Sequence, residues 1–66
     1  MKLGIIGGTG WLGGAIARRL LSQRFVAPDD LHLSNRSGKR DGFETWPDVT
    51  ITADNQTLVD ACDCVV

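Results

Sequence analysis

A run of glycines near the start of the chain has the spacing of a phosphate-binding turn. Gly8, Gly10 and Gly13 satisfy the pattern GxGxxG, directly after the apolar segment 2–6 and directly before a segment with helical periodicity. A buried strand that turns through glycines into a helix directs free N–H groups and the positive end of the helix dipole at a ligand. These groups suit the pyrophosphate of a dinucleotide. Because eight of the 66 residues are glycine, the strand-to-helix context carries more weight than the spacing alone.

Each glycine of this pattern has an expected task. Gly8 permits the tight turn, Gly10 lets phosphate oxygens approach the backbone, and Gly13 removes a side chain where the helix packs on the strand. Two roles stay open for Trp11, which lies among them: it shields the pyrophosphate, or it packs onto a further domain. The alternative for the whole run is a glycine-rich turn that binds nothing.

The segment after the second expected strand should select the cofactor. In dinucleotide-binding folds an acidic residue at this position usually binds the ribose 2′-hydroxyl of NAD. The residues found here are Ser34, Asn35, Arg36 and Ser37. An arginine fork beside Ser and Asn donors suits the 2′-phosphate of NADP(H), and Lys39 and Arg40 add positive charge nearby. NADP(H) is therefore predicted over NAD(H); the alternative is a solvated basic turn without a ligand.

The periodicity of the apolar residues predicts the elements that position these two segments. Strands are expected at 2–6, 31–34, 49–52 and 62–66, and helices at about 11–23 and 55–61. The first strand should be buried on both faces. The apolar stripe of the first helix is expected at Leu12, Ala15, Ile16 and Leu20. Residues 39–47 are expected to form an irregular turn or a short helix, and Thr52 or Asp54 should cap the second helix. This order predicts an α/β fold, a Rossmann-type doubly wound parallel sheet that stops at about the fourth strand.

Composition excludes several classes of function. The formal net charge is −1 and the basic residues are spread along the chain, so no nucleic-acid partner is expected. No apolar run is long enough for a membrane span or a signal peptide, which predicts a cytoplasmic protein. Cys62 and Cys64 lack partners for a metal site, and unpaired cysteines fit a reducing compartment. His32 stands alone, without a second histidine at ligand spacing, and no metal site is predicted.

Length predicts that residues 1–66 are the amino-terminal dinucleotide-binding domain of a longer protein. Chains below about 70 to 80 residues rarely gain more than about 3 to 5 kcal/mol from one core. The sequence also stops within the apolar run 62–66, whereas a domain rarely ends in the middle of a strand.

These segments together resemble the pyrroline-5-carboxylate reductases, and the resemblance covers essentially the whole chain. That family has a glycine turn of the form GxGNM(G/A)xA(I/L), a proline-containing loop, a strand ending near Asn-Arg, a segment containing Asn, and an Ala-Asp-hydrophobic strand. The matching parts here are the turn 8–16, Pro28, Asn35-Arg36, Asp54-Asn55 and the run 62–66.

The resemblance implies the NADP(H)-binding domain of an enzyme that reduces 1-pyrroline-5-carboxylate to proline by hydride transfer. It assigns the pyrophosphate to Gly8, Thr9, Gly10, Trp11, Leu12 and Gly13. It assigns the 2′-phosphate to Asn35, Arg36 and Ser37, and it places Asn55 near the adenosine ribose.

Two departures from the family pattern matter. Trp11-Leu12 replaces the Asn-Met pair, which changes the side chains at the start of the helix but not the backbone cradle. The Val-Lys-Pro motif and the carboxyl-terminal helical domain, which in the family forms the dimer and most of the imino-acid pocket, lie outside these residues. The 66 residues are therefore expected not to catalyse alone, no catalytic residue is assigned among them, and homo-oligomers are expected only through that domain.

A competing interpretation uses the same glycines. Gly7, Gly10 and Gly13 also fit GxxGxxG, and the run resembles the fingerprint of extended or atypical short-chain dehydrogenases and their NADP-sensing regulatory relatives. The long connection through Pro28 and the Asn35-Arg36 turn favour the reductase.

Overall fold

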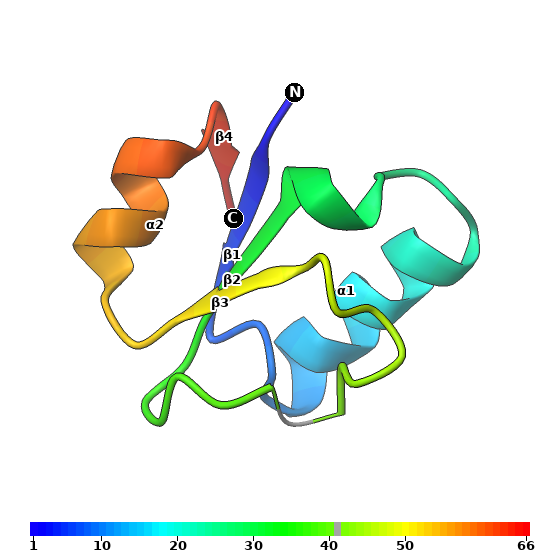
Figure 1. Ribbon diagram of the computed structural model, residues 1–66, viewed down its shortest axis with the longest axis horizontal. Coiled ribbons are helices and arrows are strands. Elements are labelled where there is room, and N and C mark those ends of the chain that lie inside the picture. The colour runs from blue at the N-terminus through cyan, green and yellow to red at the C-terminus, as the bar shows by residue number, and fades with distance from the viewer. Residues whose placement is uncertain (41) are drawn as a thin grey trace.

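The parallel sheet that the periodicity predicts is present, with a helix on each face. In the computed structural model, which describes residues 1–40 and 42–66, four parallel strands lie in the order β3-β2-β1-β4. Helices α1 and α2 lie on opposite sides of this sheet (Figure 1). The elements in chain order are β1 (Leu3–Ile6), α1 (Trp11–Ser22), the 3₁₀ helix η1 (Pro28–Asp30), β2 (Leu31–Ser34), β3 (Thr50–Thr52), α2 (Asn55–Ala61) and β4 (Cys64–Val65). The predicted α/β class and the four strands are confirmed.

Strand β1 lies between β2 and β4 and sets the register of both. Leu3 is aligned with Leu31 of β2 and with Cys64 of β4, and Leu33 of β2 is aligned with Ile51 of β3. Because all four strands are parallel, their carboxyl ends lie at one edge of the sheet. The turns that leave β1, β2 and β3 therefore meet at that edge.

The larger part of the core lies between the sheet and α1. Strand residues that face α1 alternate with residues that face the opposite side. The buried members of this cluster are Ile5, Ala17, Leu21, Leu31, Leu33, Phe43 and Val49. Two of them, Phe43 and Val49, come from the connection between β2 and β3, so that connection is part of the core.

The second face of the sheet is covered by α2, and its packing depends on a glycine. A Cβ atom at Gly4 would lie 2.6 Å from the Cδ2 atom of Leu58, the buried residue of α2. The absence of a side chain at Gly4 thus lets the helix approach β1. Strand β1 is only partly buried on this face, because Ile6 is 47% exposed. The expectation of a first strand buried on both faces holds for its centre but not for its end.

The buried face of α1 differs from the predicted stripe. Its buried residues are Gly14, Ala17 and Leu21. Of the predicted stripe, Leu20 is partly buried against the core, whereas Leu12, Ala15 and Ile16 are exposed. Small residues face the glycine turn because the helix start lies against its backbone, and this contact sets the rotation of the helix. Apolar periodicity alone cannot detect such a constraint, since glycine contributes little to the pattern.

Helix α1 ends in a Schellman motif whose left-handed residue is an arginine. The backbone N–H of Arg24 donates to the Leu21 carbonyl and that of Phe25 donates to the Leu20 carbonyl, the pair of bonds typical of this motif. Arg24 has φ = 59°, a conformation in which a Cβ atom is strained and glycine is favoured.

Arg24→Gly is therefore expected to stabilise the fold by about 1 kcal/mol, because it relieves the left-handed strain at the end of α1. The free energy of unfolding from urea denaturation, followed by circular dichroism, measures the change. Ser22→Gly, within the last helical turn, is the control and should destabilise by about 1 kcal/mol. Equal losses in both variants would show that Arg24 is not strained.

The connection between β2 and β3 is irregular, as predicted for residues 39–47; Asp41 lies outside the described residues. The guanidinium Nη1 of Arg40 donates to the carbonyls of Trp46 and Val49. The rings of Phe43 and Trp46 have centroids 6.0 Å apart, and the Arg18 guanidinium lies 5.5 Å from the Phe43 centroid. These contacts hold a segment without regular structure against α1.

The predicted cap of α2 is also present. The Oδ1 atom of Asp54 accepts from the backbone N–H of Gln56, and its Oδ2 atom accepts from the Thr57 hydroxyl. The hydroxyl of Thr52 in turn accepts from the backbone N–H of Asp54. Both predicted residues thus take part, with Asp54 as the N-cap.

Candidate functional site

The glycine turn follows β1 at the carboxyl edge of the sheet. It is closed by a hydrogen bond to the carbonyl of Gly7, the first residue of the turn. Gly7 has φ = +71°, and its carbonyl accepts from the N–H of Gly10 at 3.0 Å. The N–H of Gly14 donates to the Gly10 carbonyl at 2.7 Å, which begins the helix. The left-handed residue that the turn needs is thus Gly7 and not Gly8, to which the sequence pattern assigned this task.

Gly8 and Gly13 are required for close packing. A Cβ atom at Gly8 would lie 2.5 Å from the Leu33 side chain, and one at Gly13 would lie 2.5 Å from the Gly7 carbonyl oxygen. The N–H of Gly8 also donates to the Ser34 carbonyl at 3.0 Å. The close packing predicted for Gly13 is present, although its neighbours are the turn residues Gly7 and Gly8 and not β1 itself. Gly8 serves the contact between the turn and β2.

The start of α1 is open to an anion. Its N-cap is Gly10, which has no side chain to accept from the first-turn N–H groups, and this first turn contains no acidic residue. The first N–H groups of a helix lack partners within the helix, and the helix dipole favours negative charge there. Trp11 is 93% exposed and Leu12 is exposed as well, so neither side chain covers the helix start.

Asn35 ties the glycine turn to the loop that follows β2. Its Nδ2 atom donates to the Thr9 hydroxyl at 2.9 Å and to the Lys39 carbonyl at 2.8 Å. Its Oδ1 atom accepts from the N–H of Gly38 at 2.6 Å. Both amide hydrogens are therefore engaged, and the amide oxygen already has a donor.

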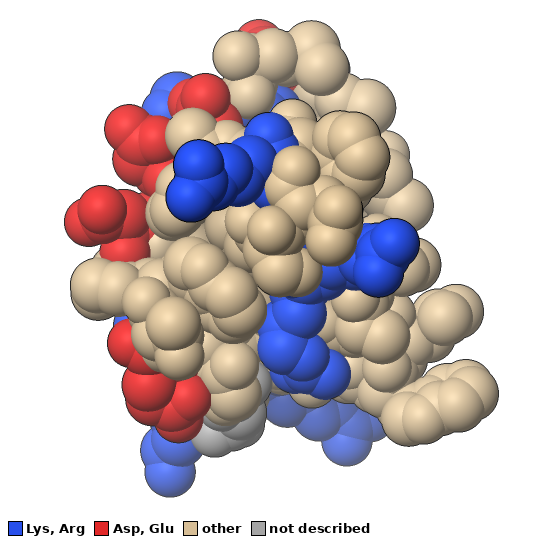
Figure 2. All heavy atoms as spheres, turned by 90° about the vertical axis from the view of Figure 1, so that its right-hand side faces the viewer, with Lys and Arg blue, Asp and Glu red and all other residues tan. Residues whose placement is uncertain are grey.

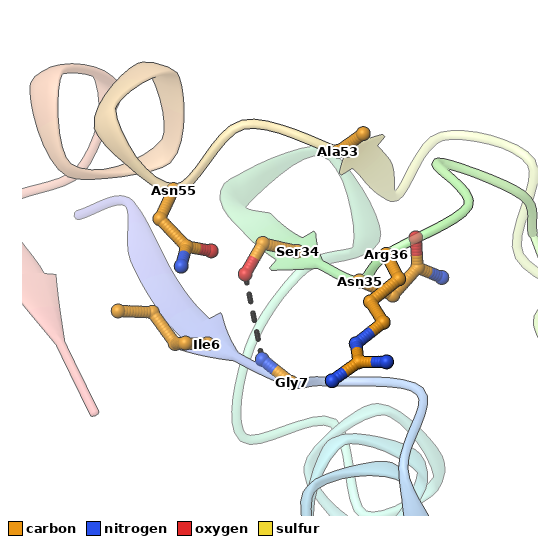
Figure 3. Close-up of a pocket in the computed structure, with 7 residues that line it drawn as sticks. All are labelled: Ile6, Gly7, Ser34, Asn35, Arg36, Ala53 and Asn55. Atoms are coloured by element: carbon orange, nitrogen blue, oxygen red, sulfur yellow. Dashed lines mark hydrogen bonds between the residues drawn. The ribbon is translucent and has the colours of Figure 1, made fainter.

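A cavity of about 210 Å³ lies at the carboxyl ends of β1, β2 and β3. Its lining residues are Ile6, Gly7, Ser34, Asn35, Arg36, Ala53 and Asn55. In Figure 3 the Arg36 guanidinium extends toward Gly7, and the side chain of Asn55 points from the start of α2 toward Ile6. The backbone N–H of Gly7 lies 3.4 Å from the accepting Ser34 hydroxyl, which joins the two strand ends beneath the cavity.

The structure brings part of the predicted site together in this cavity. Ser34, Asn35, Arg36 and Asn55 line it, although they come from two segments about 20 residues apart. The predicted residues that do not line it are Gly8, Thr9, Gly10, Trp11, Leu12, Gly13 and Ser37. Six of these form the adjoining turn and helix start, while the Ser37 hydroxyl accepts from the N–H of Lys39 at 3.1 Å.

Among the described lining residues, Ile6 and Ala53 were missed by the sequence reasoning, and Gly7 entered it only through the competing GxxGxxG pattern. All three lie at or just beyond the carboxyl end of a strand. Ligands bind at that edge in open parallel sheets, so the strand ends themselves were the available signal.

The charges around the site are unevenly distributed. Arg36 is exposed and is the only charged residue among the described residues that line the cavity. Arg40, predicted to add charge, has its Nη1 group bound to backbone carbonyls. Figure 2 shows Lys and Arg side chains across the face that carries α1, with Asp and Glu gathered along one side. The net charge of −1 thus results from basic and acidic side chains that gather on different parts of this face.

Neither Cys62 nor Cys64 is among the described residues that line the cavity. Burial raises the pKa of the Cys62 thiol, and the neighbouring Asp63 carboxylate raises it further, against a smaller opposing effect of Lys2. The thiol therefore stays protonated near neutral pH. Within residues 1–40 and 42–66, no group of three His, Cys, Asp or Glu side chains is placed to hold a metal ion.

Within the same described ranges, neither helix has the length and apolar character that crossing a membrane requires.

Comparisons with known proteins found no relative of this chain. No protein-family model matches the chain, and neither the curated proteins nor the solved structures give a significant match.

Proposed function

We propose that this chain binds NADP(H) as the nucleotide-binding part of an oxidoreductase resembling the pyrroline-5-carboxylate reductases. The observation that carries the proposal is the cavity at the carboxyl ends of three parallel strands, which both Gly7 and Arg36 line. It joins the two features that a phosphorylated dinucleotide needs, a backbone cradle and an arginine fork.

The arrangement of the strands also supports this proposal. The order β3-β2-β1-β4 equals that of the first four strands of the Rossmann sheet. In that fold the ligand lies outside the carboxyl ends of the strands, where the strand order reverses. Here the order reverses at β1, and the glycine turn leaves β1 at that edge.

Each phosphate group of NADP(H), and its adenosine ribose, would have residues of this chain placed to bind it. The pyrophosphate would meet the backbone from Gly7 to Gly13 at the start of α1. Arg36 would bind the 2′-phosphate, and Asn55 and the Ser34 hydroxyl would face the ribose. When bound, the nicotinamide would supply the hydride for reduction of the C=N bond of 1-pyrroline-5-carboxylate to proline. The role of this chain is to bind and orient the cofactor.

One observation favours a second candidate with the same cofactor. The left-handed turn falls on Gly7, and both Gly10 and Gly13 lie against its carbonyl. The three glycines that close the turn around the Gly7 carbonyl therefore have the GxxGxxG spacing of extended or atypical short-chain dehydrogenases and of NADP-sensing regulators. Formation of proline from 1-pyrroline-5-carboxylate and NADPH by a protein containing this chain would support the reductase, and its absence would favour the second candidate.

The cofactor is tested by titrating the chain with NADPH and NADH while recording tryptophan fluorescence. The Trp46→Phe variant leaves Trp11, at the start of α1, as the reporting residue. Tighter binding of NADPH than of NADH is expected. A folded chain that binds neither cofactor contradicts the proposal.

Arg36→Gln is expected to weaken NADPH binding by about ten- to a hundredfold, because hydrogen bonds to charged groups contribute about 1.5 to 3 kcal/mol. NADH binding should change little, since NADH has no 2′-phosphate. Arg19→Gln, which removes the same charge from the last turn of α1, is the matched control and should leave both affinities unchanged. A parallel loss for NADPH and NADH in Arg36→Gln would exclude a 2′-phosphate contact.

A further inference from the structure

The side-chain amide of Asn35 lies between the two parts of the proposed cofactor site. The backbone N–H of Asn35 donates to the Thr52 carbonyl at 3.0 Å, which fixes the residue to β3. From there its side chain reaches Thr9, between Gly8 and Gly10, at 2.9 Å. Both Asn35 and Thr9 are half-buried. This bond therefore joins the glycine turn to the loop that carries Arg36.

The same side chain also shapes the loop itself. Its Oδ1 atom accepts from Gly38, which has φ = +69°, and its Nδ2 atom donates to the Lys39 carbonyl. Because both Nδ2 hydrogens have acceptors, Asn35 offers no free donor to a 2′-phosphate. The direct contact that the resemblance assigns to Asn35 is thus at odds with its hydrogen bonds.

We propose that Asn35, acting through the Thr9 hydroxyl, is a positioning residue that couples the pyrophosphate site to the 2′-phosphate site. This inference rests on the proposed function. Arg36 directly follows Asn35, so the bond to Thr9 sets how far the guanidinium lies from the glycine turn. A ligand that occupies both sites benefits from this fixed spacing, whereas a ligand that occupies one site does not.

Thr9→Val tests the coupling, because valine keeps the β-branched shape and removes only the hydroxyl. The ligands are NADPH, which spans both sites, adenosine 2′-monophosphate, which has no 5′-phosphate to reach the glycine turn, and inorganic pyrophosphate. NADPH affinity should fall about five- to tenfold, the loss expected when one neutral hydrogen bond no longer holds the sites in register. The affinities for the two smaller ligands should stay within about twofold of the wild-type values, since each needs only one site.

Conservative and distant variants separate coupling from a general structural effect. Thr9→Ser keeps the hydroxyl and should restore NADPH affinity. Thr50→Val, at an exposed position at the start of β3, should change none of the three affinities. Thr9→Ala serves as a second variant without the hydroxyl should Thr9→Val fail to fold, as judged by circular dichroism, and it should show the same selective loss.

The possible outcomes distinguish this inference from the proposed function. If the wild-type chain prefers NADPH and the variants without the hydroxyl retain full NADPH affinity, the coupling is wrong and the cofactor site stands. An equal loss for all three ligands also overturns it, because that pattern indicates a general disturbance. A folded wild-type chain that binds none of the ligands overturns the proposed function, and the coupling fails with it.

Discussion

Gly13→Ala is expected to destabilise the fold by about 1 to 2 kcal/mol and to abolish measurable NADPH binding. A Cβ atom at this position would lie 2.5 Å from the Gly7 carbonyl oxygen and 3.3 Å from the Gly8 Cα atom. Both neighbours are backbone, so the turn or the helix must move, at a typical cost of about 1 to 3 kcal/mol and occasionally more. The preference of alanine for helices, about 1 kcal/mol over glycine, offsets part of this cost. Urea denaturation and NADPH titration measure the two effects.

The adjacent residue provides a matched control. A Cβ atom at Gly14 would lie 3.3 Å from the Arg18 guanidinium, the mobile end of a long side chain, and 3.4 Å from the Thr9 carbonyl carbon. Gly14→Ala gains the same helix preference without approaching the Gly7 carbonyl oxygen. It should therefore leave stability unchanged or raise it by up to about 1 kcal/mol. Equal stabilisation in both variants would mean that the backbone of the glycine turn shifts at little cost in free energy. The turn would then not hold a ligand rigidly.

The succession of strands and helices along the chain and the position of the glycine turn could be predicted because both depend on local sequence. The alternation of Leu31, His32, Leu33 and Ser34 gives the period of a strand. The apolar segment before Gly7 and the helical segment after Gly13 place the turn between them. Parallel strands then bring the ends of β1, β2 and β3 to one edge of the sheet. That edge holds the cavity, so much of the candidate site follows from local patterns.

The roles of individual side chains could not be predicted in the same way, because they depend on contacts between distant residues. Leu12 and Ile16 have helical spacing, but the contact of Gly13 with Gly7 rotates them toward solvent. Asn35 has the chemistry of a phosphate ligand, but its amide is engaged by Thr9, 26 residues away in the chain. The sequence shows which hydrogen bonds such a residue can make, but it does not show with which partner the residue makes them.

The connection between β2 and β3 contains a core residue that the sequence did not predict. Residues 39–47 of this connection were expected to form an irregular turn or a short helix, and no core position was assigned to Phe43 or Trp46. Phe43 is instead fully buried beside α1. Arg40 holds the segment there through the carbonyls of Trp46 and Val49. An irregular segment can thus supply a central core residue when side-chain to backbone bonds replace regular structure.

Phe43→Ala is expected to have the largest effect on stability, a loss of about 3 to 5 kcal/mol. The substitution removes a ring that is 0% exposed, together with its contacts to Trp46 and the Arg18 guanidinium. A domain of this size rarely gains more than about 3 to 5 kcal/mol from its core. The variant should therefore be largely unfolded at 25 °C, as measured by circular dichroism without denaturant.

Phe25→Ala makes the same chemical change at a position that is 74% exposed, just beyond the end of α1. Its free energy of unfolding should lie within about 0.5 kcal/mol of the wild-type value, as is usual for surface substitutions. The difference between the two alanine variants then measures burial, because the deleted atoms are identical. If Phe43→Ala is no less stable than Phe25→Ala, the β2–β3 connection does not belong to the core. In that case the core does not hold the connection that carries Arg36, and the position of Arg36 at the cavity is not fixed by packing.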